Sequence, residues 1–131
     1  MRVKVLVADD DVDNRTIARE ILEASGFHVV MAVDGEEALA VIRAERPAVV
    51  VLDLSMPKLS GWEVAKRVRA DDAIKSTPLI AFTAHALVGD ELKAKTAGCD
   101  DYISKPCKPR DLVTKVKQWI DREYDRQEKP L

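Results

Sequence analysis

The sequence predicts an α/β protein, a (βα)5 domain in which five strands alternate with five helices around one parallel sheet. Two observations carry this prediction. Short, nearly continuous apolar runs recur along the chain, as expected for parallel strands buried on both faces. Segments of about 10 to 14 residues with helical spacing separate them, which is typical of right-handed βαβ units. The length of 131 residues fits one domain, and 47% hydrophobic residues can supply one core.

The first strand is expected over residues 3–8 and is followed by a helix over about 13–25 that stops before Gly26. A weaker strand over 27–32 leads through the Asp34-Gly35 turn into a helix over 36–45, which must end before Pro47. The residues expected on the inner face of the first helix are Ile17, Ala18, Ile21 and Leu22.

Residues 49–52 form the most apolar run, so we expect this strand at the centre of the sheet. A loop over 55–60 contains the breaker Pro57 and precedes a helix over 61–70. A fourth strand is expected over 79–82 and a helix with a thin apolar face over 87–97. The residues expected on the inner face of the third helix are Val64, Ala65 and Val68.

A short fifth strand is expected over 102–104, and the last helix is expected to start near Pro109. Beyond Asp121 the chain is almost wholly polar, so we expect it to fray. The predicted division is a domain over 1–122 and a polar C-terminal tail over 123–131. The core stripe expected on the last helix comprises Leu112, Val113, Val116, Trp119 and Ile120.

Composition excludes several classes of function. A net charge of -2 provides no basic field for nucleic acid. Apolar runs of about 6 residues are far shorter than the roughly 20 needed to cross a bilayer. Met1 and Arg2 lead straight into the first strand, so we expect no signal peptide and a cytoplasmic location.

Cys99 and Cys107 fit neither a zinc motif nor a CxxC motif. Reduced, partly buried thiols are expected, and a redox sensor or a disulfide are the alternatives.

Polar residues stand where the predicted strands end: Asp9-Asp10-Asp11, Asp53, Thr83 and Lys105-Pro106. In open parallel sheets, ligands bind outside the carboxyl ends of the strands at the switch point in strand order. Carboxylates brought together there repel one another unless a cation is present, and Mg²⁺ prefers such oxygen ligands. A hydroxyl and an ammonium add partners for a phosphoryl group, and an aspartate can carry an acyl phosphate.

Each of these residues has a plainer interpretation when taken alone. The three aspartates could form a helix N-cap and a solvated loop, Thr83 could be a structural strand-end residue, and Lys105 could be a surface lysine. Their joint occurrence, in this order and on these strands, favours a site that binds a divalent cation and a phosphoryl group.

The motifs VKVLVADDD, VVVLDLSMPKLSGWEVAKRVR, TPLIAFTAHA and GCDDYISKPCKP resemble the CheY-like receiver domain of two-component response regulators. The resemblance covers essentially the whole chain, from Arg2 to about Arg122, and implies a doubly wound, flavodoxin-like sheet. It implies that Asp53 is the phosphoacceptor and that Mg²⁺ is held by Asp9, Asp10, Asp53 and the main-chain carbonyl of Ser55.

The same resemblance assigns three further roles. Thr83 is expected to be the switch hydroxyl, Tyr102 the aromatic side chain that changes rotamer, and Lys105 the lysine that contacts the phosphoryl group. The Lys105–Pro106 peptide bond is expected to be cis. His85 could modulate hydrolysis of the acyl phosphate or simply lie at a solvated helix start, and Trp62 could be a packing residue or a partner contact.

The implied function is that of a stand-alone response regulator, Mg²⁺-dependent and not an enzyme beyond slow self-dephosphorylation. It would accept a phosphoryl group from a histidine kinase or a histidine phosphotransfer protein. It would signal through residues 87–120 to a downstream protein, or pass the phosphoryl group on, as a monomer or weak homodimer that binds neither nucleic acid nor membrane. The alternatives are a phosphohydrolase of the haloacid dehalogenase type, a module that works without phosphorylation, and a receiver excised from a longer protein.

Overall fold

The computed structural model describes residues 2–84 and 89–128 and has one five-stranded parallel sheet. The strand order is β2-β1-β3-β4-β5, with every neighbouring pair parallel. The predicted (βα)5 fold and the central place of the strand over 49–52 are confirmed. The strands are β1 (Lys4–Ala8), β2 (His28–Ala32), β3 (Val49–Leu52), β4 (Leu79–Thr83) and β5 (Asp101–Ser104).

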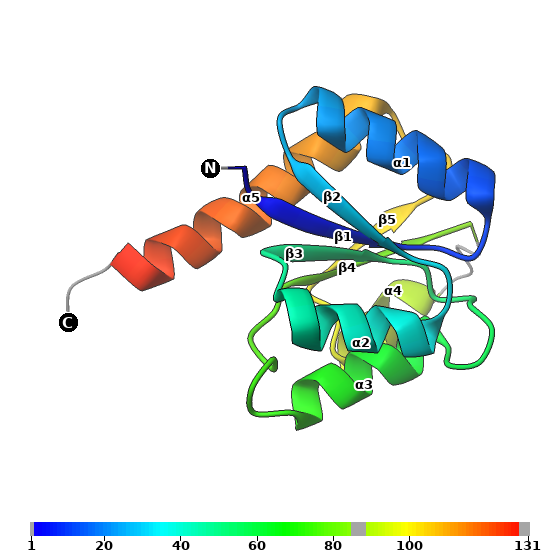
Figure 1. The fold of residues 1–131 in the computed structure, drawn as a ribbon. Coiled ribbons are helices and arrows are strands. Elements are labelled where there is room, and N and C mark those ends of the chain that lie inside the picture. The colour runs from blue at the N-terminus through cyan, green and yellow to red at the C-terminus, as the bar shows by residue number, and fades with distance from the viewer. Residues whose placement is uncertain (1, 85–88, 129–131) are drawn as a thin grey trace.

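Helices cover both faces of the sheet, which makes the fold doubly wound. Figure 1 shows α1 and α5 on one face and α2, α3 and α4 on the other. This arrangement follows from the strand order, because the chain moves outward from β1 to the edge strand β2 and then returns past β1 to β3. The helices are α1 (Val12–Ala24), α2 (Gly35–Glu45), α3 (Gly61–Ala70), α4 (Asp90–Ala97) and α5 (Pro109–Glu128).

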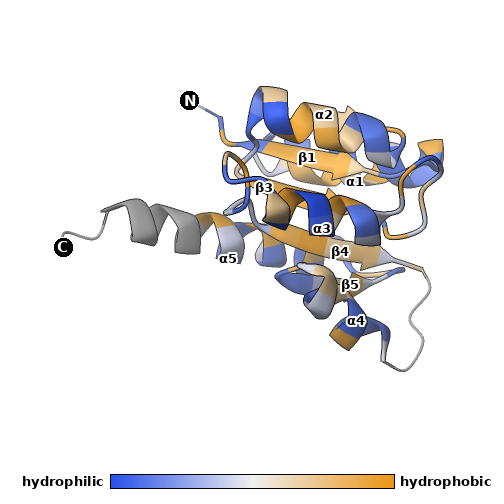
Figure 2. Ribbon diagram, turned by 90° about the horizontal axis from the view of Figure 1, so that it is seen from below, coloured by the Kyte–Doolittle hydropathy of each residue, from blue (hydrophilic) through white to orange (hydrophobic). Residues whose placement is uncertain are grey.

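Two hydrophobic clusters hold the layers together, one on each face of the sheet. Leu6 and Val50 point toward α2, α3 and α4, whereas Val5 and Val51 point toward α1 and α5. All four residues of β3 are at most 1% exposed, so each of its faces packs against one of the two layers. The apolar strands lie between helices whose outer surfaces are largely hydrophilic (Figure 2).

Short polar side chains begin three of the helices. Asp11 caps α1 by accepting hydrogen bonds from the backbone N–H groups of Asp13 and Asn14, at 2.9 and 3.0 Å. Asp34 caps α2 and Ser60 caps α3 in the same manner. These caps place the N-termini of α1 and α3 beside the carboxyl ends of β1 and β3, where the candidate site lies.

Two expectations about the helices differ from the structure, and a third falls outside the described residues. α5 continues to Glu128 rather than fraying beyond Asp121, because the polar residues there include good helix formers and no breaker. Ile17 is 55% exposed, so only Ala18 and Leu22 of the expected inner face of α1 are buried. The described part of α4 starts at Asp90; the expected start at Leu87, together with His85, lies outside the described residues.

Candidate functional site

The site lies at the switch point of the sheet, between the carboxyl ends of β1 and β3. Ala8 and Leu52 are partners in the parallel register, so the residues that follow them emerge side by side. The backbone N–H of Asp53 donates to the carbonyl of Ala8 at 2.9 Å, and that of Asp9 donates to Ala32 at 3.1 Å. The sheet ladder thus continues one residue past each strand and fixes the backbone of both aspartates.

Three carboxylates converge at this edge. Asp9, Asp10 and Asp53 each offer one oxygen, and these oxygens lie within 4.8 Å of one another. Asp9 and Asp53 are buried, with 3% and 8% exposure, whereas Asp10 is exposed. Two buried carboxylates beside a solvent-facing third form an all-oxygen donor set that is open on one side, which suits a small, hard, partly hydrated cation.

Lys105 brings the positive charge into the cluster. Its Nζ donates to Oδ2 of Asp9 at 2.5 Å and lies 3.7 Å from Oδ2 of Asp53. The ammonium is also 5.1 Å from the centroid of the Phe82 ring, a favourable cation–π distance. One ammonium among three carboxylates leaves the cluster negatively charged, so a bound cation would relieve repulsion that Lys105 offsets only in part.

Burial raises the pKa of the Asp53 carboxyl above its usual range. The backbone N–H of Ser55, which donates to Oδ1 of Asp53 at 3.1 Å, and the charge of Lys105 act in the opposite direction. The nearby carboxylate of Asp9 raises the pKa of Asp53 further. A carboxylate whose negative charge is poorly compensated is well placed to bind a cation.

Thr83 and Tyr102 lie on the neighbouring strands β4 and β5. Thr83 is 1% exposed, and its carbonyl accepts a hydrogen bond from the backbone N–H of Lys105 at 2.9 Å, which joins the ends of the two strands. Tyr102 is half-buried and packs against the cluster on the α2–α4 face of the sheet. Its hydroxyl is buried and has no hydrogen-bond partner among the described residues. The Lys105–Pro106 peptide bond is cis, as expected.

Sequence comparison agrees with this geometry. Residues 5–117 match the response regulator receiver domain family. The chain belongs to this family. It is 35% identical to the polar-differentiation response regulator DivK of Brucella anthropi over 120 residues, which cover 92% of the chain and 98% of DivK. Receiver domains are phosphoacceptor modules of two-component signalling rather than enzymes in the usual sense, so the expected family and general function are confirmed.

Solved receiver structures have the same fold. The receiver domain of Francisella response regulator 1452 superposes with a TM-score of 0.87 at 32% identity, over 93% of this chain and 99% of that one. The receiver domain of the sensor histidine kinase PA1611 from Pseudomonas aeruginosa superposes with a TM-score of 0.86 at 30% identity, over 92% and 99%. In that protein a magnesium ion is coordinated in the active-site cleft.

Two supporting residues of this receiver were not singled out by the sequence. Arg15 Nη1 donates to the carbonyl of Asp9 at 2.8 Å and holds the loop after β1. Gly61 lies so close to β3 that a Cβ there would be 2.3 Å from the carbonyl oxygen of Asp53. Only the absence of a side chain lets α3 begin beside the candidate acceptor. Arg15 lies outside the quoted motifs, and Gly61 lies inside VVVLDLSMPKLSGWEVAKRVR, but the role of each depends on a contact that only the fold creates.

The two thiols have no part in the site. Cys99 and Cys107 are both free, so the disulfide alternative is wrong. Burial raises the pKa of the Cys99 thiol to about 12 and also raises that of Cys107. Both thiols are therefore poor nucleophiles at neutral pH, which argues against a redox sensor.

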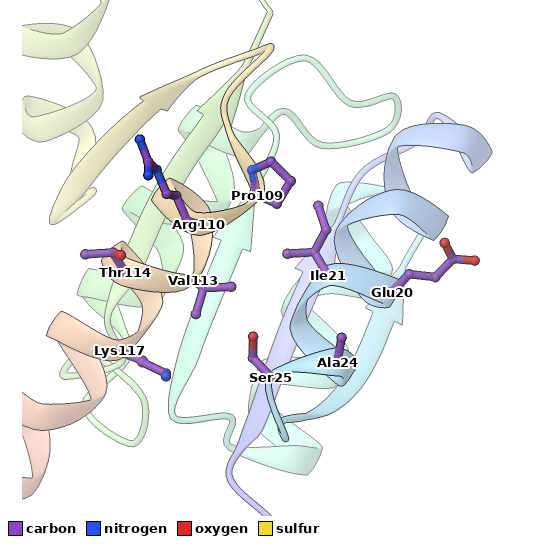
Figure 3. A pocket seen from close by; sticks show the side chains of 9 residues that line it. All are labelled: Glu20, Ile21, Ala24, Ser25, Pro109, Arg110, Val113, Thr114 and Lys117. Carbon is purple, nitrogen blue, oxygen red and sulfur yellow. The ribbon is translucent and has the colours of Figure 1, made fainter.

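A shallow groove runs along the face of the receiver formed by α1 and α5. Figure 3 shows Ile21 of α1 facing Pro109 and Val113 of α5, with Glu20 pointing away from α5; Lys117 also lines the groove. A smaller cavity of about 180 Å³ adjoins it, shares Ile21 and is also lined by Ile17, Lys105 and Pro106. An apolar surface therefore extends from the carboxylate site along α1. None of the helices in ranges 2–84 and 89–128 is long and apolar enough to cross a membrane.

Proposed function

We propose that Asp53 accepts a phosphoryl group from a phosphohistidine of a sensor kinase or a histidine phosphotransfer protein. The observation that carries this proposal is the buried Asp53 carboxylate, which lies within 4.8 Å of the oxygens of Asp9 and Asp10 and 3.7 Å from the Lys105 ammonium. Phosphoryl transfer depends mainly on positioning and charge neutralisation, and this arrangement supplies both.

Mg²⁺ fits the donor set. The carboxylates of Asp9, Asp10 and Asp53 and the main-chain carbonyl of Ser55 would hold it, and the magnesium site of the PA1611 receiver supports this assignment. The exposed position of Asp10 leaves room for water and phosphoryl oxygens to complete the coordination. When bound, Mg²⁺ neutralises negative charge on the phosphoryl oxygens during transfer.

In the transfer, a carboxylate oxygen of Asp53 bonds to phosphorus as the P–N bond of the phosphohistidine breaks. The leaving imidazole, which carries a proton on its other ring nitrogen, departs as a neutral ring. Lys105 turns from Asp9 to the new phosphoryl oxygens, and the Thr83 hydroxyl donates a hydrogen bond to one of them. Attack of water on the acyl phosphate releases inorganic phosphate and restores Asp53, which gives slow self-dephosphorylation.

The phosphodonor must contact the surface around the carboxylates. Val12 and Ile17 of α1 are 60% and 55% exposed, and Ile17 lines the same cavity as Lys105. These side chains and the groove between α1 and α5 offer an apolar surface to a histidine-bearing helix. Output would then use residues 87–120, whose described part contains β5, α4 and the first turns of α5.

The test is phosphorylation with Mg²⁺ and a small acyl phosphate, followed by intact mass measurement. The parent protein should gain one group of about 80 Da. Asp53→Asn should gain none, and Asp101→Asn, which alters a carboxylate outside the cluster, should be labelled like the parent. Labelling of the Asp53→Asn variant at the parent level would show that the acceptor assignment is wrong.

A phosphohydrolase remains the second candidate, since it would also use an aspartyl nucleophile. It would place the nucleophile in the Asp9–Asp11 segment, but Asp11 caps α1 and Asp9 is paired with Lys105. Asp53 is therefore the remaining candidate for the nucleophile. Burial raises the pKa of its carboxyl, and one of its oxygens lies close to those of Asp9 and Asp10. Turnover of a generic phosphate ester would favour the hydrolase, and its absence together with labelling of Asp53 would favour the receiver.

A further inference from the structure

A second groove lies between α3 and α4, on the opposite face of the sheet from α1 and α5. The two helices contact each other, and the hollow between them has a volume of about 390 Å³. Its lining comes from two residues of α3 and four of α4: Trp62, Lys66, Leu92, Lys93, Thr96 and Ala97.

The apolar part of this groove is larger than the fold requires. Leu92 is 71% exposed and is the most exposed large hydrophobic side chain of the described residues. Trp62 is half-buried, because its side chain packs against the hydrophobic core and also lines the groove. Isolated apolar side chains are common on protein surfaces and need no explanation, but Leu92 and Trp62 line the same hollow and so form one apolar patch. Covering them would remove apolar area from water, which favours association.

The charged part of the groove has one sign. Lys66 and Lys93 line it, and neither takes part in an ion pair within the described part of the chain. Glu63 of α3 pairs with Arg67 at 3.6 Å and Glu91 of α4 pairs with Lys95 at 3.4 Å, so these two glutamates are already compensated by other side chains. The groove therefore presents an apolar floor between two uncompensated ammonium groups, one on each helix.

We propose that the α3–α4 groove binds an acidic amphipathic helix of a partner protein. An apolar side chain of that helix would sit between Trp62 and Leu92, and carboxylates on either side of it would meet Lys66 and Lys93. A second copy of this chain fits less well, because a symmetric contact through this face would bring the same lysines together.

The proposal does not depend on Asp53 as the acceptor, so its test uses the unphosphorylated full chain without acyl phosphate. Two synthetic helical peptides serve as probes: both carry leucines at i and i+4, with flanking glutamates in one and flanking lysines in the other. Amide and indole chemical shifts are followed by NMR during titration. The acidic peptide should shift the Trp62 indole and the amides of α3 and α4 saturably, whereas the basic peptide should not.

Two variants define the chemistry of the groove. The double charge reversal Lys66→Glu and Lys93→Glu should weaken the acidic peptide at least about tenfold and create binding of the basic peptide. Leu92→Ser should weaken the acidic peptide without unfolding the protein, because that side chain is already exposed. The matched control reverses Arg110 and Lys117, which line the groove between α1 and α5, and should bind the acidic peptide like the parent.

Three outcomes would overturn the proposal. The first is equal binding of both peptides, and the second is a set of shifted resonances confined to α1 and α5. The third is concentration-dependent dimerisation through α3 and α4, measured by sedimentation equilibrium and abolished by Leu92→Ser, because the occupant would then be a second copy.

Discussion

The ammonium of Lys105 donates a hydrogen bond to the Asp9 carboxylate, and this pair joins the end of β5 to the end of β1. The Lys105 and Asp9 side chains are 11% and 4% exposed. Breaking such a buried pair leaves a charge without compensation, which typically costs a few kcal/mol. The pair therefore contributes to the stability of the fold as well as to the proposed chemistry.

Replacing Lys105 with Met should lower the free energy of unfolding by about 3 kcal/mol without divalent ions, because Asp9 and Asp53 both lose the ammonium that lies beside them. Mg²⁺ should restore a larger share of stability to the variant than it adds to the parent. Urea denaturation with and without Mg²⁺ measures both effects. Lys4→Met is the matched control, because its pair with Glu45 is exposed, and it should change neither quantity measurably. Equal Mg²⁺ effects in Lys105→Met and the parent would contradict this account.

The sequence predicted the fold closely because the signals that define it are local. All five strands were placed within one residue at each end, since an apolar run marks a buried parallel strand wherever it lies. The convergence of Asp9, Asp10 and Asp53 followed from strand ends and strand order alone. The same reasoning favoured a site for a divalent cation and a phosphoryl group, whereas the choice of Asp53 as phosphoacceptor came only from the resemblance to receivers; these roles stay predictions.

Features that depend on contacts between distant segments could not be predicted. The need for glycine at position 61 arises because α3 starts against the carbonyl of Asp53. Ile17 fits the apolar spacing of α1 but lies on the side that faces the cavity beside Lys105. Trp119 packs against the core cluster as the stripe on α5 predicted, but the hydrogen bond from its Nε1 to Asp101 at 2.9 Å could not be read from the spacing. In each case a neighbour far along the chain decides the outcome.

Mg²⁺ should raise the melting temperature of the parent protein, because it binds the native carboxylate cluster and not the unfolded chain. Asp10→Ala should largely remove this rise, since Asp10 is exposed and its loss disturbs no packing. Asp13→Ala is the matched control: Asp13 is also an exposed acidic residue near the start of α1, but it lies outside the cluster. Thermal melting with Mg²⁺ and with a chelator tests this. A rise that persists in Asp10→Ala and vanishes in Asp13→Ala would place the ion elsewhere.

Gly61→Ala should disturb the acceptor directly. The added methyl would lie 2.3 Å from the Asp53 carbonyl oxygen and 2.7 Å from Cα of Leu54, so the backbone of one segment must move. Overpacking of this kind costs about 1–3 kcal/mol. We expect that loss in urea denaturation and slower labelling by acyl phosphate. Gly26→Ala is the control: it has open space and only the cost of its positive φ, so labelling should be unchanged.

The Asp101 carboxylate should make stability sensitive to acid. Burial raises its pKa, but hydrogen bonds from Trp119 and Lys115 lower it more, so the pKa lies below the usual range. A carboxyl with a lowered native pKa stabilises the fold above its unfolded pKa of about 3.9, and this contribution is lost as pH falls through the native value. Asp101→Asn should be less stable than the parent at pH 7, and the difference should shrink below about pH 4.

Urea midpoints measured from neutral to acid pH check this expectation. Asp72→Asn is the control, because the Asp72 side chain is 95% exposed, and its midpoints should follow those of the parent. A gap between Asp101→Asn and the parent that stays constant with pH would mean that Asp101 acts by packing alone.

The Tyr102 hydroxyl should lower the stability of the unphosphorylated protein. Its hydroxyl is buried without a hydrogen-bond partner among the described residues, which disfavours this position of the ring by about 1–3 kcal/mol. Tyr102→Phe removes the hydroxyl and keeps the ring packed on the cluster it contacts, so unphosphorylated Tyr102→Phe should be more stable than the parent by about 1 kcal/mol. The measurement is urea denaturation of the unphosphorylated proteins. A less stable Tyr102→Phe would show that the hydroxyl is satisfied in solution.

The same substitution tests the proposed switch. If phosphorylation at Asp53 draws Thr83 toward the new anion and lets the Tyr102 ring move, the penalty on the phenol should differ between the two states. The stability gained by Tyr102→Phe should then change when acyl phosphate and Mg²⁺ are present. In a Thr83→Ala background it should not change, because the hydroxyl that links the anion to the ring is gone. In the protein that keeps Thr83, the stability gained by Tyr102→Phe could instead be the same with and without phosphorylation. That result would show that Tyr102 is not part of the switch, and Asp53 would then act by passing its phosphoryl group on in a phosphorelay.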